Sequence, residues 1–429
     1  MGIVRRSAMA IPVLLALVLF GARPAAAQCA YPTPVTPATC EAAKQYNAST
    51  GGVSLLVWVN GQVVCEDYNS GSGPNVAHEL WSCTKSFSGA MAAAAIDDGL
   101  ISSWDERLVE TIPEWRGDPR KSQVTLRQLL SLTSGIQAEV SGMPTYAEAI
   151  LVPATHDPGT YWEYGSVPYQ IFGEFMRRKL APNYVDPLAY MQARFFAPIG
   201  AQYSGWTRGT DNMPHLPWGS QWTPREWINY GELVRLGGWW PPLQQQLIAQ
   251  ESLDAAFHRS PVNAEYGLTW WLPVPGNVRI PCDAVMAVGL GTQELYVIRS
   301  LKLVAARQTD APWDGLNYSH EEFLDRLLAP ANPQDDCPPA EVQELRLARS
   351  GVDLLFDWAA VNRDATGNSE LVGGYDLWSA TEPDFSDPLP LGETMGPVSA
   401  SIAPGAAGAA DAIVYYQVRA RDKCGNDGP

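Results

Sequence analysis

The stretch LWSCTKSFSGAMAAAAIDDGL, residues 80–100, contains a serine and a lysine three positions apart, where a helix of small residues begins. Small side chains let a helix pack closely against a sheet, so we expect this helix to be buried, and Gly99 can terminate it. At positions i and i+3 the Ser82 hydroxyl and the Lys85 amine project from the same face. The rest of the chain must decide whether this pair carries a reaction or whether Ser82 is only a helix cap.

Burial would give the pair its chemistry. Desolvation lowers the pKa of a lysine, which leaves part of the Lys85 amine neutral and able to accept the Ser82 proton. The helix N-terminus adds backbone N–H groups beside a developing oxyanion. Ser-Lys pairs are a known alternative to Ser-His-Asp in acyl transfer. The motif alone is weak evidence, because a chain of this length contains about one Ser-x-x-Lys by chance.

Composition limits the class of protein. A chain of 429 residues predicts two folded units, and 46% hydrophobic with 17% charged residues is typical of a globular protein. The net charge of −17 argues against nucleic acid or an anionic membrane as the main partner. We assign the acidic balance no catalytic meaning.

The N-terminus predicts export. Arg5 and Arg6 precede the apolar run 10–20, and Ala25-Ala26-Ala27 gives a small-x-small cleavage pattern, so residues 1–27 read as a signal peptide. The alternative is a retained anchor. The mature protein is then expected in a periplasm or outside the cell, without stable membrane insertion.

Export would place the seven cysteines in an oxidising compartment. We predict a local pair of Cys29 with Cys40, and a pair of Cys337 with Cys424. The other three include at least one free thiol: Cys65, Cys83 and Cys282. No cysteine or histidine cluster in the sequence has metal-ligand spacing.

The first part of the chain mixes strands and helices. Residues 28–46 read as an N-terminal linker, and Asn60-Gly61 between β-rich runs predicts a hairpin. Thr125 is a predicted helix cap, and Gly237-Gly238 ends a helix in WINYGELVRLGGWW.

Strand signals return later in the chain, at 266–274 and in a hairpin over 293–308, before a helix opened by the capping box Ser319-x-x-Glu322. Strands at both ends with helices between them predict an α+β fold. Its antiparallel sheet is flanked by helices, is closed by distant parts of the chain and carries an inserted helical subdomain, within a domain 47–330.

After a Pro/Asp-rich linker, 331–338, residues 339–429 show short alternating strands that predict a small β-sandwich. Trp358, Tyr375 and Tyr416 stand where fibronectin type III-like domains carry core aromatics, and this segment resembles those domains. No ligand follows from it. A spacer or an adhesion module that contacts a cell surface is the expected role.

A second cluster is DPGTYWEYGSVPYQIFGEF, residues 157–175. Tyr164 beside a Ser-Lys pair would relay a proton between nucleophile and leaving group. The alternative is a packed aromatic. The sequence offers little support for another kind of serine-hydrolase site, because Gly-x-Ser-x-Gly is absent and the five histidines are scattered.

Several boxes in order carry a family resemblance: residues 80–115 with the Ser-x-x-Lys helix, TLRQLLSLTSGI, DPGTYWEYGSVPYQIFGE and GLGTQELYVIRSLKLVAAR. Residues 50–329 resemble the β-lactamase-related serine hydrolases. These include class C β-lactamases, D-alanyl-D-alanine carboxypeptidases, family VIII esterases and 6-aminohexanoate-dimer hydrolases, of which the last look closest.

The resemblance implies roles. Ser82 would be the acylated nucleophile, Lys85 its base and Tyr164 a proton-transfer group. The N–H of Ser82 and one near Leu290 would form the oxyanion hole. The substrate would be a small-molecule ester or amide, with no metal or cofactor.

Two departures bear on the substrate. Ser166 stands where the second box usually ends in Asn, and Ala287-Val288-Gly289 replaces Lys-Thr-Gly or His-x-Gly. The missing cation costs a charge-assisted contact with a substrate carboxylate, about 1.5–3 kcal/mol, which argues against β-lactams. Five tryptophans could line an apolar acyl pocket, and the alternative is plain core packing: Trp162, Trp239, Trp240, Trp270 and Trp271.

We therefore predict an exported serine hydrolase that cleaves an ester or linear amide through a Ser82 acyl-enzyme. One alternative is a penicillin-interactive carboxypeptidase or β-lactamase. The other is a catalytically silent cell-surface binding protein.

Overall fold

The computed structural model describes residues 35–310, 317–328, 339–350, 353–364, 367, 370–381, 385, 388–395, 399–403 and 414–428. The predicted signal peptide, the linker 331–338, Cys29 and Cys337 lie outside these residues. Within them, no helix has both the length and the apolar character needed to cross a bilayer.

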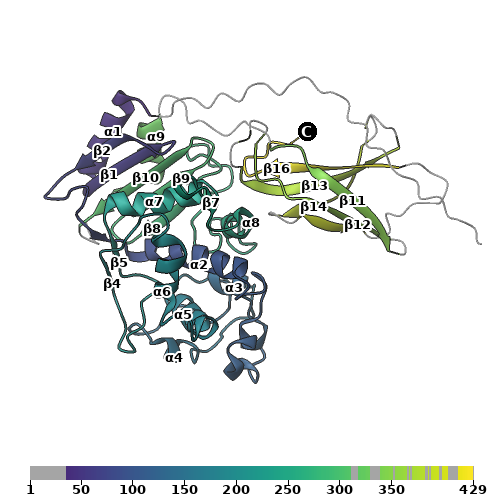
Figure 1. Ribbon diagram of the computed structural model, residues 1–429, viewed down its shortest axis with the longest axis horizontal. Helices are drawn as coiled ribbons and strands as arrows, with labels where there is room; N and C mark the ends of the chain where they lie inside the picture. Colours follow the sequence, from purple (N-terminus) through teal and green to yellow (C-terminus); the bar gives the residue numbers. More distant parts are fainter. Residues whose placement is uncertain are drawn as a thin grey trace, which may run out of the picture.

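One five-stranded antiparallel sheet forms the centre of the fold, in the order β2-β1-β10-β9-β8 (Figure 1). Its strands are β1 Gly52–Val59, β2 Gln62–Tyr68, β8 Val285–Gly289, β9 Gln293–Ile298 and β10 Leu303–Thr309. β1 pairs with β10 from Gly52↔Thr309 to Val59↔Leu303, so the two ends of this part of the chain share one sheet. The predicted closure by distant segments is confirmed.

Both predicted hairpins are present. Asn60 (φ 52°) and Gly61 (φ 74°) are both left-handed and join β1 to β2, as a two-residue type I′ turn requires. β9 and β10 pair from Arg307↔Glu294 to Leu303↔Ile298.

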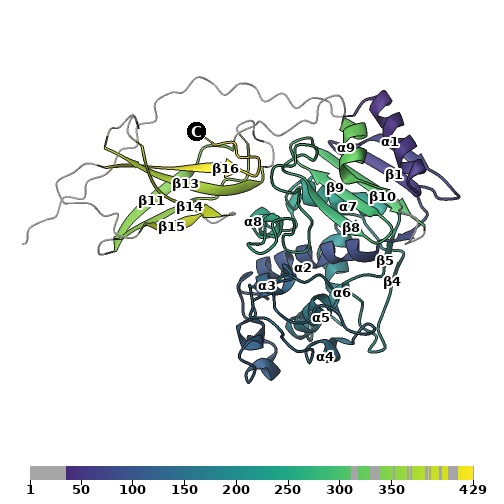
Figure 2. The ribbon, with the colours of Figure 1, turned by 180° about the vertical axis from the view of Figure 1, so that it is seen from behind.

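Side chains alternate between the two faces of the sheet. Leu295 and Val297 of β9 belong to the core shared with α2 (Lys85–Asp97) and α7 (Pro224–Arg235). Tyr296 and Ile298 belong to the core under α1 (Pro37–Ser49) and α9 (His320–Leu328). The sheet is therefore covered by helices on both faces, as Figure 2 shows from behind.

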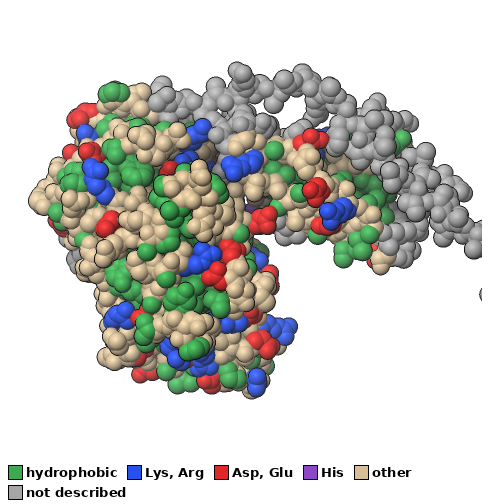
Figure 3. Space-filling model, in the orientation of Figure 1, with side chains coloured by type: hydrophobic (Ala, Val, Ile, Leu, Met, Phe, Trp, Pro, Cys, Tyr) green, Lys and Arg blue, Asp and Glu red, His purple; other side chains and the backbone are tan. Residues whose placement is uncertain are grey.

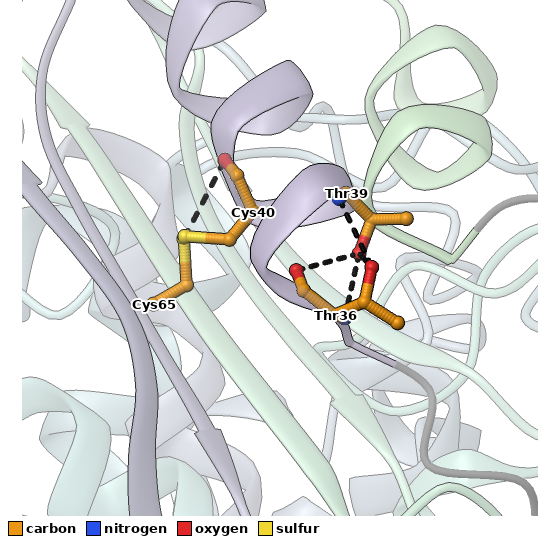
Figure 4. The surroundings of a disulfide bond; sticks show 4 residues. All are labelled: Thr36, Thr39, Cys40 and Cys65. Carbon is orange, nitrogen blue, oxygen red and sulfur yellow. Dashed lines mark hydrogen bonds between the residues drawn. A yellow bond between two sulfur atoms is a disulfide. The ribbon is translucent and has the colours of Figure 1, made fainter.

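Residues 37–46 of the predicted N-terminal linker 28–46 are helical, which corrects that expectation. Thr36 caps α1: its Oγ1 accepts from the Thr39 N–H at 3.2 Å, and Thr39 Oγ1 accepts from the Thr36 N–H at 2.9 Å (Figure 4). Pro37 follows at the first helical position, where a missing N–H costs nothing. The Pro/Thr-rich composition marked a helix start rather than a linker.

The inserted subdomain lies between β2 and β8. Its helices are α3 Leu126–Leu130, α4 Tyr146–Ala149, α5 Val167–Leu180, α6 Pro187–Met191 and α8 Gln250–Asp254, with a π-helical turn Gln192–Phe196. Short strands accompany them: β3 His78–Glu79, β4 Gly205–Trp206, β5 Ser220–Trp222, β6 Trp239–Trp240 and β7 Gln245–Gln246. Thr125 caps α3 as predicted, since its side chain accepts from the Gln128 N–H.

The strand predicted over 266–274 is wrong. Tyr266 and Trp271 form only isolated bridges, with each other and, for Trp271, with Met286 at the outer edge of β8. Thr269 is left-handed (φ 82°), which breaks an extended run.

The disulfides differ from both predicted pairings. Cys40 of α1 is bonded to Cys65 of β2 (Figure 4), and Cys282 to Cys424. Cys83 is the free cysteine of the described residues, and it is buried. Spacing along the chain favoured the wrong partners, because the true ones meet only through the fold.

The C-terminal segment forms two three-stranded sheets, β11-β12-β15 and β14-β13-β16. The strands are β11 Gln343–Ser350, β12 Asp353–Ala359, β13 Val372–Ala380, β14 Leu389–Met395, β15 Ala400–Ala403 and β16 Tyr415–Asp422. Trp358 and Tyr375 are buried between the sheets and Tyr416 is partly buried against the same core. The predicted small β-sandwich is confirmed as a fold.

This sandwich is attached to the first part of the chain at α8 (Figure 1). Gln250 Nε2 donates to the carbonyl oxygens of Asn362 (3.1 Å) and Glu370 (3.2 Å), and the Cys282–Cys424 bond lies at the same junction. Lys/Arg and Asp/Glu side chains are interspersed on the face in Figure 3, so the net negative charge forms no single patch there.

Candidate active site

Ser82 and Lys85 lie in direct contact at the start of α2. Ser82 belongs to the 3₁₀ turn Trp81–Thr84, which continues into α2, and the i, i+3 spacing keeps both side chains on one face. Lys85 Nζ donates to Ser82 Oγ at 3.0 Å and to the Pro217 carbonyl oxygen at 2.9 Å. Lys85 is only 3% exposed. The sequence-predicted pair is therefore a buried, hydrogen-bonded pair.

Burial controls the charge state of this lysine. Desolvation lowers the pKa of Lys85 to about 7, although Glu139 and Cys83 act in the opposite direction. Its amine also lies over two aromatic rings, 4.8 Å from the centroid of Tyr164 and 5.3 Å from that of Tyr169. About half of the amine is thus neutral at neutral pH, as a general base requires.

Tyr164 adjoins the pair. Desolvation raises the pKa of Tyr164 to about 12, although the nearby Ser82 side chain acts in the opposite direction. The phenol is therefore protonated at neutral pH. One serine hydroxyl lies between an amine and a phenol, a geometry that can move a proton to and from an attacking oxygen.

The end of β8 packs against the turn that carries Ser82. A Cβ on Gly289 would lie 2.3 Å from the Leu80 carbonyl oxygen and 3.1 Å from Cys83 Sγ. The Cys83 thiol donates to the Gln293 carbonyl oxygen at 3.1 Å, which fixes the same turn to β9. Leu290 follows directly, with 44% of its surface exposed.

Comparison with known proteins identifies the family. The family described as Beta-lactamase matches residues 38–280, more than half of the chain and the whole region that holds Ser82, Lys85 and Tyr164. The chain belongs to the beta-lactamase family. It is a serine hydrolase of that family. A search of curated proteins finds no match.

Solved structures support the same fold. A family VIII carboxylesterase aligns with a TM-score of 0.56 and 15% identity over 68% of this chain and 97% of that one. A hydrolase with promiscuous acyltransferase activity, EstCE1, aligns with a TM-score of 0.55, 12% identity, and coverage of 68% and 98%. A penicillin-binding protein homolog from Caulobacter crescentus gives 0.54, 15% identity, and coverage of 68% and 97%. At these identities the likeness concerns the fold alone.

The second box of this beta-lactamase-family chain has an unexpected partner. Ser166 precedes α5 and donates its Oγ proton to Glu139 Oε1 at 3.0 Å, not to Lys85. Glu139 is exposed, and it acts electrostatically on both Lys85 and Tyr164. Sequence reasoning missed Glu139, because it lies in an irregular loop and belongs to no motif.

The acyl pocket of tryptophans stays a prediction, but two of the five lie near Tyr164. Trp162 lies 6.1 Å from Tyr164 and 6.1 Å from Trp271, ring centre to ring centre. Trp270 instead packs in the core against Tyr230. Trp239 and Trp240 form β6 and join no ring contact with Tyr164 in the described residues.

A second aromatic pair involves the residue next to Ser82 in the chain, and it was not predicted. Trp81 stacks on Trp218 with ring centroids 6.2 Å apart. The two rings adjoin Ser82 and Pro217, the residue that accepts from Lys85. Only the fold brings residues 81 and 218 together, so no local signal pointed to this pair.

No group of three or more His, Cys, Asp or Glu side chains with metal-binding arrangement occurs in the described part of the chain.

Proposed function

We propose that this protein hydrolyses a small ester or linear amide through an acyl-enzyme on Ser82. The observation that carries the proposal is the 3.0 Å contact between Ser82 Oγ and a buried Lys85 whose pKa is about 7. A neutral amine at that distance accepts the serine proton as the oxygen attacks a carbonyl carbon.

The proton then has a short path to the leaving group. Tyr164, which adjoins Ser82 and is protonated at neutral pH, donates to the departing alkoxide or amine and recovers a proton from Lys85. The main-chain N–H groups of Ser82 and Leu290 are the proposed oxyanion donors, because β8 packs directly on the Ser82 turn. Water attacks the acyl-enzyme in the second half of the cycle, with the same groups in reverse roles.

The charge around the site supports neutral or cationic substrates over anionic ones. Positions 287–289 of β8 carry Ala, Val and Gly, so no cation faces a substrate carboxylate from this strand. Glu139, held by Ser166, adds a negative charge that acts on Lys85. A carboxylate-bearing β-lactam or peptide therefore meets repulsion where related enzymes offer attraction. Trp162 and Gly289 are proposed to border the acyl group.

Two features of the whole chain belong to the same proposal. Residues 1–27 are proposed as a signal peptide, and the two disulfides of the structure are compatible with an exported protein. We propose 47–330 as the hydrolase domain and 339–429 as a fibronectin type III-like module that contacts a cell surface.

The test is turnover of a substrate panel by the purified protein: short-chain p-nitrophenyl esters, a 6-aminohexanoate dimer and nitrocefin. Ester or linear-amide turnover should be lost in Ser82→Ala and Lys85→Ala, and an acyl adduct should appear on wild type by intact mass. Lys121→Ala is the matched control, because Lys121 is also buried but donates to the Ile150 carbonyl oxygen instead. Turnover that persists in Ser82→Ala refutes the assignment, and a preference for nitrocefin favours the penicillin-interactive alternative.

A further inference from the structure

A second serine of this chain is hydrogen-bonded to a histidine, outside the Ser82 site. Ser72 Oγ lies 2.8 Å from His78 Nε2, and His78 Nδ1 lies 2.7 Å from Asp310 Oδ1. The three side chains thus form a continuous chain from carboxylate through imidazole to hydroxyl. Neither Lys85 nor Tyr164 takes part in it.

The direction of these hydrogen bonds follows from their chemistry. A carboxylate accepts only, so His78 Nδ1 must carry a proton and donate it to Asp310. Burial lowers the pKa of His78, against the effect of Asp310, which favours the neutral ring. A neutral imidazole protonated at Nδ1 has its lone pair on Nε2, so the Ser72 hydroxyl donates to it. This is the tautomer in which a histidine acts as general base toward a serine.

The three hydrogen-bonded side chains come from three separate elements of the fold. Ser72 closes a tight turn after β2, in which its N–H donates to the Asn69 carbonyl oxygen at 2.9 Å and Ser70 is left-handed (φ 53°). His78 is in β3, paired with Trp222 of β5. Asp310 directly follows β10. A non-glycine residue in the left-handed region costs about 1 kcal/mol, so the fold enforces this turn.

The arrangement is accessible from solvent at its reactive end. Ser72 is half-buried, and Gly71, Asn75 and Val76 of the same loop are exposed. His78 is 8% exposed, so the imidazole is shielded while Ser72 keeps contact with solvent.

We propose that Ser72, His78 and Asp310 form a second nucleophilic site that is acylated by small activated esters and phosphonylated by fluorophosphonates. Ser72 Oγ attacks the carbonyl carbon, its proton passes to His78 Nε2, and the carbon–oxygen bond to the alkoxide breaks. The alkoxide leaves with the proton from His78. The acyl group then stays on Ser72, so this site gives one stoichiometric adduct and adds no ester turnover to that of Ser82. With a fluorophosphonate, the bond to fluoride breaks instead and the adduct stays on Ser72.

The test must separate this serine from Ser82. Trypsin cannot do so, because the chain has no lysine or arginine between Lys44 and Lys85. Cleavage after glutamate, at Glu66 and Glu79, isolates residues 67–79 with Ser72 from the following peptide with Ser82. The Ser82→Ala full-length protein is incubated with an ethyl fluorophosphonate probe, digested in this way and sequenced by tandem mass spectrometry.

We expect an adduct on Ser72 in the Ser82→Ala protein. Its rate should fall about 100-fold or more when His78→Gln is added, as for loss of a general base, and by a smaller factor with Asp310→Asn. Ser70→Gly, which suits the left-handed turn, is the matched control and should leave the rate unchanged.

Two results overturn the proposal. One is an unmodified 67–79 peptide after prolonged incubation of the Ser82→Ala protein with a large molar excess of the probe. The other is an adduct formed equally fast in His78→Gln, with the same melting temperature as its parent. Because the Ser82 peptide is scored separately, failure here leaves the Ser82 mechanism untouched, and failure of labelling at Ser82 in wild type leaves this site untouched.

Discussion

Gly289 lies directly against the main chain of Leu80, so closely that a Cβ at Gly289 would stand 2.3 Å from the Leu80 carbonyl oxygen. Leu80 precedes the 3₁₀ turn that carries Ser82, and Gly289 ends β8. This contact sets the spacing between the nucleophile and the strand proposed to supply an oxyanion donor.

Gly289→Ala should therefore impair catalysis more than folding. The added methyl pushes β8 from the Ser82 turn, and a misplacement of that size costs about 10- to 100-fold in rate. The measurement is kcat/KM for a p-nitrophenyl ester, together with the melting temperature. Gly117→Ala is the control, since a Cβ there meets open space. An unchanged kcat/KM would show that this contact does not position the reacting groups.

The rate should depend on the protonation of Lys85. With the pKa of Lys85 at about 7, the base is neutral above that pH, so kcat/KM should rise through about pH 7 and level off. Lys85→Arg should be inactive at every pH, because a guanidinium stays protonated in this range. Lys121→Arg serves as the control. A flat profile between about pH 5 and 8 would rule out Lys85 as the base.

Glu139→Gln should change both the pH profile and substrate selection. Glu139 raises the pKa of Lys85, so its loss should move the acid limb of kcat/KM to lower pH. It should also reduce the preference for cationic over anionic esters, seen mainly in KM. Glu110→Gln is the control, since this exposed carboxylate affects neither Lys85 nor Tyr164. Equal changes in KM for cationic, neutral and anionic esters would contradict the proposed role of Glu139 in selecting substrates by charge.

Lys423 is a buried amine whose removal should stabilise the fold. Its Nζ is buried without a hydrogen-bond partner in the described residues, and burial lowers the pKa of Lys423 to about 7. Lys423→Met should raise the free energy of unfolding by about 1–3 kcal/mol at neutral pH. The unfolded chain keeps the usual lysine pKa and binds more protons between pH 7 and 10.5, so wild-type stability rises with pH there and the gain should shrink.

Urea denaturation at several pH values measures this effect. Lys44→Met, on the surface of α1, should change the unfolding free energy by less than about 0.5 kcal/mol. A destabilised Lys423→Met would mean that the amine is paired in solution.

The Cys282–Cys424 bond should hold the β-sandwich to the hydrolase region. It closes a separation of 142 residues, so replacing both cysteines by serine should destabilise the junction by about 3–5 kcal/mol. We expect denaturation to split into two transitions. The control is the Cys40/Cys65 double serine variant, whose bond closes 25 residues within one domain. It should lower the stability of the hydrolase region without splitting denaturation into two transitions. One unaltered, concerted transition in the Cys282/Cys424 variant would contradict this.

Local patterns predicted the parts of this fold that depend on neighbouring residues. The Asn60-Gly61 turn, the Thr125 cap and the end of α7 at Gly237 follow from backbone preferences that a few residues determine. The Ser82–Lys85 contact also follows from local spacing, because the helix itself sets it.

Other features required the assembled chain. Both disulfides, the Glu139–Ser166 contact and the Trp81–Trp218 stack join segments whose proximity no local pattern encodes. The strand predicted at 266–274 failed for a different reason, because the local pattern there was misleading. Its aromatic residues favour strands, but Thr269 takes a left-handed backbone so that Trp271 can meet Met286.

The pairing of β1 with β10 also determines when the active site can assemble during synthesis of the chain. Residue 52 must wait for residue 309 before the sheet closes, and such distant contacts make assembly slow. Ser82 and Lys85 leave the ribosome early, and β8 with the Leu290 amide follows only after more than half of the chain has been made. A growing chain thus carries Ser82 for much of its synthesis without the strand beside it, and the proposed hydrolytic site forms only after β10 has emerged.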